Sequence, residues 1–125
     1  MNKQNKKILI IDDDANNIFA LSAVLRSKGY SCIPALSASE GLNLLSCSHD
    51  IGIVLMDMMM PEMDGYMIIP KIKQDNFLAG IPVIAVTAQA MPGDKERCIT
   101  AGADGYISKP VNVDVLLKIL SNYIK

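Results

Sequence analysis

The sequence lacks long hydrophobic runs, and this absence removes several classes of protein. Half of the 125 residues are hydrophobic, yet no apolar run approaches the ~18 residues of a membrane span. The polar, basic segment at 1–7 leads into only four apolar residues, which is too short for the core of a signal peptide. We therefore expect neither a membrane segment nor a secretory leader in this sequence.

Cysteine and histidine are also scarce. Cys32, Cys47 and Cys98 are widely spaced and odd in number, which argues against a disulfide framework and fits a reduced, cytoplasmic protein. The single histidine, His49, has no metal-type spacing to any cysteine, and a surface loop position explains it best. Thiolate or imidazole metal centres are thus not expected.

An excess of one charge is the third absence. The formal net charge is -1, and lysine and arginine form no long cluster, so nothing favours a nucleic-acid partner. The length predicts one domain over residues 1–125, with a core at about 6–124, large enough to bury its own interior.

What the sequence does contain is an alternation of short apolar runs and helical patterns. Several of the runs are nearly continuous, as in strands that are covered on both faces. The expected strands are Ile8 to Ile11, Ser31 to Ala35, Ile51 to Met56, Pro82 to Val86 and Gly105 to Ile107, and the expected helices are 15–28, 38–46, 65–74, 92–101 and 112–124. This order predicts an α/β fold with a parallel sheet, right-handed crossovers and helices on both faces.

Residues at the expected helix ends support these boundaries. Ser37 and Glu40 have the spacing of a capping box, and Asn112 can cap the last helix. Other signals are Pro92 at a first helical position and Gly29 and Gly102 at helix ends. Pro70 fits poorly, because it lies inside the third helix, where it should remove a hydrogen bond and kink the axis.

Polar residues gather where the expected strands end. The first strand leads into Asp12, Asp13 and Asp14, the third into Asp57, the fourth into Thr87, and the fifth into the run Ser108 to Pro110. In open parallel sheets the functional site lies at the carboxyl ends of the strands. We therefore expect these side chains to form one site.

The residue types at that edge suit phosphoryl transfer. Crowded carboxylates repel one another unless a cation neutralises them, and Mg²⁺ is bound by a few carboxylates together with phosphate oxygens. Asp12, Asp13 and Asp57 supply carboxylates, Lys109 a positive charge, and Thr87 a hydroxyl donor. An aspartate can also act as the nucleophile and form an acyl phosphate.

Simpler and rival readings account for less of this pattern. Asp14 is expected to cap the first helix, and each of the other residues would be ordinary if it stood alone. A phosphatase of the haloacid-dehalogenase type would need a second acid two positions after Asp57, where this chain has Met59. A flavin mononucleotide carrier would need a phosphate loop after the first strand, where this chain is anionic. A degenerate docking module would lack part of the set.

The motifs resemble those of response-regulator receiver domains over about residues 6 to 124. The matching segments are Ile-Leu-Ile-Ile-Asp-Asp-Asp at 8–14, Leu-Met-Asp-Met-Met-Met-Pro-Glu-Met-Asp-Gly at 55–65, Val-Thr-Ala at 86–88 and Tyr-Ile-Ser-Lys-Pro at 106–110. The resemblance implies a flavodoxin-like (βα)5 fold with strand order 2-1-3-4-5. The segments at 91–94 and 101–105 are similar to receivers of hybrid kinases and to single-domain regulators.

The resemblance also implies a role for each site residue. Asp57 would accept a phosphoryl group from a phosphohistidine, and Lys109 would pair with its oxygens. Thr87 would move to bond the phosphoryl group, and Tyr106 would follow it inward. The Mg²⁺ ligands would be Asp13, Asp57 and the backbone carbonyl of Met59, with Asp12 acting through water.

The implied partners are a sensor histidine kinase or a histidine phosphotransfer protein, and a downstream target on the face of the fourth helix, fifth strand and fifth helix. Helical periodicity places Leu21, Val24, Leu25 and Lys28 toward the sheet and Phe19 nearly opposite. An exposed Phe19 beside the acidic residues makes the first helix our expected docking face for the phosphodonor.

Overall fold

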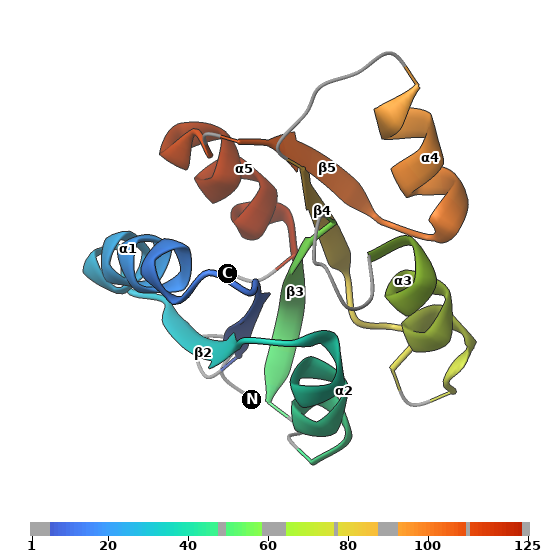
Figure 1. Cartoon of the computed structure of the whole chain (residues 1–125). Coiled ribbons are helices and arrows are strands. Elements are labelled where there is room, and N and C mark those ends of the chain that lie inside the picture. The colour runs from blue at the N-terminus through green and yellow to red at the C-terminus, as the bar shows by residue number, and fades with distance from the viewer. Residues whose placement is uncertain are drawn as a thin grey trace.

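The fold is a parallel sheet between two layers of helices, seen in a computed structural model that describes residues 6–47, 50–58, 65–76, 78–87, 93–109 and 111–123 (Figure 1). The strands are β1 (Lys7–Ile11), β2 (Ser31–Ala35), β3 (Ile51–Asp57), β4 (Val83–Thr87) and β5 (Gly105–Ser108). They pair in the order β2-β1-β3-β4-β5, and every pairing is parallel. The predicted strand order is therefore confirmed.

Helices cover both faces of this sheet. They are α1 (Ala15–Ser27), α2 (Ala38–Cys47), α3 (Gly65–Gln74), α4 (Asp94–Ala101) and α5 (Val113–Tyr123). Figure 1 shows α1 and α5 on one side of the sheet and α2, α3 and α4 on the other. This is the doubly wound arrangement that alternating strands and helices with right-handed crossovers produce.

The sheet separates the apolar interior into two cores. Leu9, Val54 and Met56 point into the core beneath α2, α3 and α4, whereas Ile8, Leu55 and Ile84 point into the core beneath α1 and α5. Alternate residues of β3 serve opposite cores, so nearly the whole strand is buried. That double burial explains why the central strands are continuous apolar runs rather than alternating ones.

Most of the predicted helix ends are confirmed. The Asp14 carboxylate accepts hydrogen bonds from the backbone N–H groups of Asn16 (2.9 Å) and Asn17 (3.4 Å) at the start of α1. Asn112 Oδ1 accepts from Val115 N at 3.1 Å at the start of α5. Gly29 and Gly102 follow α1 and α4 with φ of 94° and 115°, a conformation that glycine adopts without strain. Pro92 lies outside the described residues.

The capping box of α2 differs from the usual arrangement in one of its two hydrogen bonds. Ser37 Oγ accepts from Glu40 N at 3.1 Å, as the spacing predicts. The returning bond joins Glu40 Oε1 to the backbone N–H of Leu36, at 3.1 Å, one residue earlier than the usual partner. The two bonds still satisfy donors at the start of the helix.

The predicted inner face of α1 is partly wrong. The residues buried against the sheet are Ile18, Ser22 and Leu25, whereas Lys28 is exposed. The helix ends at Ser27, so helical periodicity no longer applies at Lys28. Leu21 and Val24 are half-buried on the side of α1 next to the inner face.

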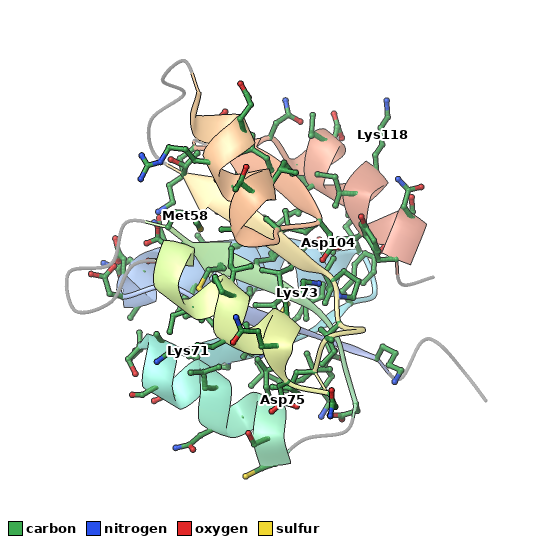
Figure 2. The ribbon with its side chains drawn as sticks, turned by 90° about the vertical axis from the view of Figure 1, so that its right-hand side faces the viewer. Met58, Lys71, Lys73, Asp75, Asp104 and Lys118 are labelled. Atoms are coloured by element: carbon green, nitrogen blue, oxygen red, sulfur yellow. The ribbon has the colours of Figure 1, made fainter. Side chains whose placement is uncertain are left out.

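The amino end of the sheet is tied together by an ion pair, which we call the Lys73–Asp104 clamp (Figure 2). Lys73 Nζ, on the last turn of α3, lies 2.6 Å from Asp104 Oδ2 and also donates to the carbonyl of Ile81 at 3.1 Å. The same carboxylate oxygen accepts from the backbone N–H of Val83 at 2.8 Å. The clamp thus joins α3 to the first residue of β4 and to the residue before β5.

Three expectations about the rest of the chain can be compared with the structure. In the residues that it describes, no helix combines the length and apolar character that crossing a bilayer requires. Cys32, Cys47 and Cys98 are all free thiols, which agrees with the absence of a disulfide framework. Pro70 lies inside α3, and the helix continues beyond it to Gln74.

Candidate functional site

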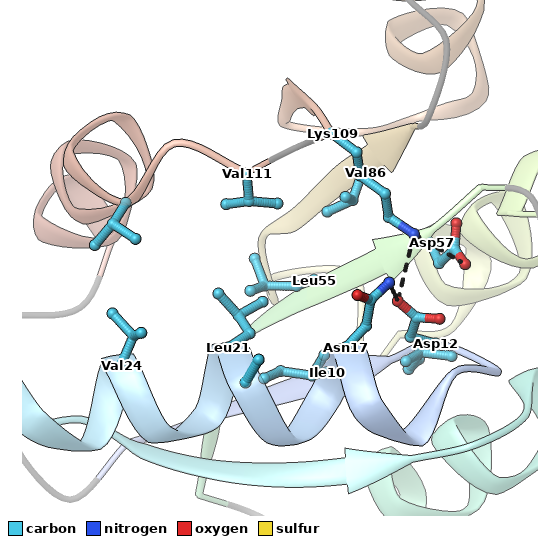
Figure 3. Close-up of a pocket in the computed structure, with 13 residues that line it drawn as sticks. Ile10, Asp12, Asn17, Leu21, Val24, Leu55, Asp57, Val86, Lys109 and Val111 are labelled. Atoms are coloured by element: carbon cyan, nitrogen blue, oxygen red, sulfur yellow. Dashed lines mark hydrogen bonds and ion pairs between the residues drawn. The ribbon is translucent and has the colours of Figure 1, made fainter.

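The carboxyl ends of β1 and β3 bring the predicted carboxylates together (Figure 3). Asp12 directly follows β1, and Asp57 is the last residue of the neighbouring strand β3. One carboxylate oxygen from each of Asp12, Asp13 and Asp57 lies within 4.8 Å of the others. Asp12 is 6% exposed and Asp57 4%, whereas Asp13 is exposed. We refer to these three residues and Lys109 as the acidic site.

Asp12 is held in place by local hydrogen bonds. Its Oδ1 accepts from the backbone N–H of Asp14 at 2.9 Å, and its Oδ2 accepts from the Asn17 side-chain amide at 3.5 Å. The sequence reasoning did not predict the contact from Asn17. Its position one turn into a helix that starts beside Asp12 was the available signal.

Lys109 supplies the positive charge from the other side of the site. Its Nζ lies 3.5 Å from Asp12 Oδ2 and 3.6 Å from Asp57 Oδ2. Its backbone N–H donates to the carbonyl of Thr87 at 2.7 Å, which fixes the residue after β5 against the end of β4. The ammonium group thus bridges two buried carboxylates that come from different strands.

Thr87 and Tyr106 lie on adjacent strands. Thr87 ends β4 and is 2% exposed. Tyr106 pairs with Ala85, two residues before Thr87, and packs against the core beneath α4 together with Ala85. Because side chains two apart share a face of a strand, Thr87 and Tyr106 lie on the same side of the sheet. Met59, predicted as a metal ligand, lies outside the described residues.

The charge balance of the site favours a divalent cation. Three carboxylates face one ammonium group, and two of the carboxylates are almost fully buried. Carboxylates this close repel one another unless a cation compensates them, and oxygen-only ligands suit Mg²⁺. The residues therefore fit a site for this ion.

A groove of about 550 Å³ opens beside the acidic site, between α1 and the segment that joins β5 to α5. Asp12, Asn17, Asp57 and Lys109 form its polar end. The remaining lining is apolar and consists of Ile10, Ile11, Ala20, Leu21, Val24, Leu55, Val86, Val111 and Val113. Figure 3 shows the charged groups at one end and Val24 toward the other. The sequence reasoning did not predict this groove.

The surroundings of Cys32 do not favour it as a nucleophile. Burial raises the pKa of the Cys32 thiol, although a hydrogen bond with Ser22 and the positive charge of Arg26 oppose the shift. A raised pKa keeps the thiol protonated, and the thiolate is the reactive form. The carboxylates at the strand ends are better candidates for covalent chemistry than Cys32.

Sequence comparisons agree with this arrangement. The family model described as Response regulator receiver domain matches residues 8–121. The chain is 43% identical, over 116 residues, to the sensor histidine kinase RcsC of Escherichia coli strain K12. That alignment covers 93% of this chain but only 12% of the kinase. It is also 36% identical to the polar-differentiation response regulator DivK of Brucella ovis, with 95% of this chain and 96% of DivK covered.

Solved structures give the same result. A CheY-like response regulator receiver domain protein from Methanospirillum hungatei superposes with a TM-score of 0.83 at 32% identity, covering 94% of this chain and 91% of that one. The chemotaxis protein CheY4 of Vibrio cholerae reaches a TM-score of 0.86 at 25% identity, covering 95% and 98% of the two chains.

Proposed function

This chain belongs to the response-regulator receiver family, and we propose on that premise that Asp57 accepts a phosphoryl group from a phosphohistidine in the presence of Mg²⁺. The observation that carries the proposal is the acidic site, in which buried Asp57 lies beside two further carboxylates and 3.6 Å from Lys109. Phosphoryl transfer depends on positioning and charge neutralisation, and this site provides for both.

The residues of the site divide the work of the reaction. A carboxylate oxygen of Asp57 attacks phosphorus, and the bond from phosphorus to the donor breaks as the aspartyl phosphate forms. Lys109 pairs with the phosphoryl oxygens from its position between Asp12 and Asp57. Bound Mg²⁺ would neutralise charge on both the carboxylates and the phosphoryl group. Asp12, Asp13 and Asp57, with the carbonyl of Met59, are the proposed groups that hold it.

Thr87 and Tyr106 are the proposed switch. Phosphorylation would add charge and acceptor oxygens at the end of β3, and Thr87, at the end of the adjacent strand β4, would move to bond them. Tyr106 shares the side of the sheet and would follow. NMR spectra after beryllofluoride treatment should change along α4, β5 and α5. Changes confined to the loops around Asp13 and Asp57 would refute the switch.

The face made by α4, β5 and α5 is the proposed surface for a downstream protein. Ile99 on α4 and Val115 on α5 are each 46% exposed. Exposed apolar side chains close to a switching strand can change their accessibility with the state of that strand. This surface adjoins Tyr106, so phosphorylation would alter its affinity for the target.

The proposed phosphodonor is a sensor histidine kinase or a histidine phosphotransfer protein, docked on α1. Phe19 is 77% exposed on this helix, close to the acidic site. Phe19→Asp should slow transfer from a phosphohistidine protein by about tenfold, without the same slowing when acetyl phosphate is the donor. Val115→Asp, on α5, is the matched control. Equal slowing with both donors, or with neither, would count against docking on α1.

Three broader aspects of the function are part of the same proposal. The described strands form one sheet, which supports a single domain. The reactions catalysed would be the chain's own phosphorylation and dephosphorylation. Free cysteines support a reducing, cytoplasmic location.

Acetyl phosphate labelling tests the central assignment. Incubation with acetyl phosphate and Mg²⁺, followed by intact mass measurement, should add one phosphoryl group to the natural chain and none to Asp57→Asn. Chelation of the metal should also prevent labelling. Asp114→Asn, an exposed aspartate on α5, is the matched control and should label normally. A phosphoryl group that persists in Asp57→Asn would refute the assignment.

A further inference from the structure

The groove beside the acidic site carries an inference about small-molecule phosphodonors. We propose that it receives the hydrocarbon tail of an acyl phosphate, so that this chain uses longer straight-chain acyl phosphates at lower concentrations than acetyl phosphate. The inference rests on the proposed function, because it assumes that Asp57 is the phosphoacceptor. It adds a specificity that the acidic site alone does not provide.

The lining of the groove has two chemically different ends. Asp12, Asp57 and Lys109 form one end, and they are the groups to which the phosphoryl transfer has been assigned. Leu21 and Val24 on α1 face Val111 on the segment before α5 toward the other end (Figure 3). A ligand that fills the groove therefore needs a phosphoryl group at one end and a hydrocarbon chain at the other, with no charged group between them. An acyl phosphate has this structure.

Charge argues for the same ligand. With a divalent cation at the carboxylates, the polar end combines that cation with the Lys109 ammonium group, and a phosphoryl dianion complements both. No ionisable side chain lines the groove beyond Asp12, Asp57 and Lys109 among the described residues. A charged or strongly polar tail would lose its hydration there without gaining a partner.

The dimensions explain why acetyl phosphate would use little of the groove. Asn17 contacts Asp12 at the polar end, and Leu21 and Val24 lie four and seven residues further along α1. At a rise of about 1.5 Å per residue, Val24 is about 10 Å from Asn17 along the helix axis. One methyl group cannot extend along that distance, whereas a chain of several carbons can. The volume of about 550 Å³ is within the usual range for small-ligand sites.

The reaction is the same for every donor of this class. An Asp57 oxygen forms a bond to phosphorus, and the bond between phosphorus and the acyl oxygen breaks. The electron pair of that bond leaves on the fatty carboxylate, so atoms and charge balance without another reactant. Straight-chain donors release the same type of carboxylate, so a preference among them reports binding of the tail.

Rates of phosphorylation with acetyl, butyryl and hexanoyl phosphate test the proposal. Burial of each methylene strengthens binding by up to about fourfold, so butyryl phosphate should half-saturate the reaction at about one tenth of the acetyl phosphate concentration. The maximal rate should change little, because the tail makes the same contacts before and during transfer. The readout is intact mass against time, with saturating Mg²⁺.

Variants at Val24 connect that preference to the groove. Val24→Phe fills the apolar end of the groove, and Val24→Thr keeps the shape of the side chain but adds a hydroxyl. Both should reduce the preference for the longer donor to about one third or less of its value in the natural chain. This preference is the half-saturating concentration of acetyl phosphate divided by that of hexanoyl phosphate. Leu36→Thr, at an exposed apolar position between β2 and α2 that does not line the groove, should keep the preference of the natural chain. Two variants of different size separate the loss of the groove from a folding defect.

Each result has a definite meaning. A lower half-saturating concentration for longer donors that is lost in the Val24 variants but kept in Leu36→Thr supports the groove. Labelling by acetyl phosphate without any preference for longer chains overturns the groove and leaves the phosphoacceptor assignment intact. An equal preference in the Val24 variants places the tail elsewhere and also overturns it. Failure of all three donors to label the chain overturns the phosphoacceptor assignment together with this inference.

Discussion

Two lysine–aspartate contacts lie at opposite ends of the same sheet, and they differ in their distances and in the hydrogen-bond partners of each lysine. At the amino end, Lys73 Nζ lies 2.6 Å from Asp104 and also donates to the carbonyls of Ile81 at 3.1 Å and Ala79 at 3.5 Å. At the carboxyl end, Lys109 Nζ lies 3.5 Å from Asp12 and 3.6 Å from Asp57. An ammonium group has three donors, so the partners of Lys73 satisfy all of them.

The contrast separates a structural ion pair from one that can respond to a ligand. In the Lys73–Asp104 clamp, the carboxylate also accepts from Val83 N, so a rearrangement would break several bonds at once. In the acidic site the contacts of Lys109, at 3.5 Å and 3.6 Å, are too long for strong hydrogen bonds. Three carboxylates also face this one ammonium group, so the site has an excess of negative charge. A cation and a phosphoryl group can replace those contacts with stronger ones. Residue type alone does not distinguish the two cases.

Lys109→Gln should produce the largest effect, because it removes the positive charge that faces the phosphoryl oxygens. We expect phosphorylation by acetyl phosphate to slow by about 10²-fold to 10³-fold. The free energy of unfolding with saturating Mg²⁺ should change by less than about 1 kcal/mol, since the long contacts of Lys109 contribute little. Single-turnover labelling and urea titration of the same preparation measure the two quantities. Normal labelling would remove Lys109 from the proposed mechanism.

Lys73→Gln should show the reverse pattern. It removes a charged donor that joins α3 to the β4 and β5 strands, and it should lower the free energy of unfolding by about 1–3 kcal/mol. Phosphorylation of the folded protein should stay within about threefold of the natural chain, because the clamp lies at the far end of the sheet.

Lys71→Gln is the matched control for the clamp. Lys71 lies two residues away on α3 and is exposed, so its loss should change the free energy of unfolding by less than about 0.5 kcal/mol. Equal destabilisation by the changes at Lys71 and Lys73 would show that the contacts of the clamp do not contribute to stability.

Asp13→Asn should have a smaller effect on stability, with a sign that depends on Mg²⁺. Without the ion, the change relieves repulsion among three close carboxylates and should raise the free energy of unfolding by about 0.5–1 kcal/mol. With the ion, the natural chain should gain more stability than the variant, because a ligand that binds only the folded state stabilises it. Thermal unfolding over a Mg²⁺ titration measures both effects. An equal gain in the two proteins would remove Asp13 from the metal site.

Sequence reasoning predicted the carboxyl end of the sheet far better than the amino end, for a physical reason. Strand ends in a parallel sheet converge, so Asp12, Asp57 and Lys109 could be grouped once the strands had been identified. The clamp joins residues 31 apart in the sequence and follows no short motif, so only the folded chain reveals it. The groove was missed for the same reason, because its lining comes from α1, from β1, β3 and β4, and from residues that follow β5.

The errors at the helices were local. Lys28 was assigned to the inner face of α1 on the assumption that the helix continued, whereas a cap ends it at Ser27. The fold order, the caps at Asp14 and Asn112, and the exposure of Phe19 followed from periodicity and capping chemistry and are confirmed.

The position of the phosphoryl group within the acidic site shows which carboxylate is the phosphoacceptor. Borohydride reduces an aspartyl phosphate to homoserine, which leaves a stable mark that peptide mass spectrometry can locate. After labelling with acetyl phosphate and Mg²⁺, we expect homoserine at position 57 and unmodified aspartate at Asp12 and Asp13. Homoserine at position 12 or 13, or labelled protein without homoserine at position 57, would contradict it.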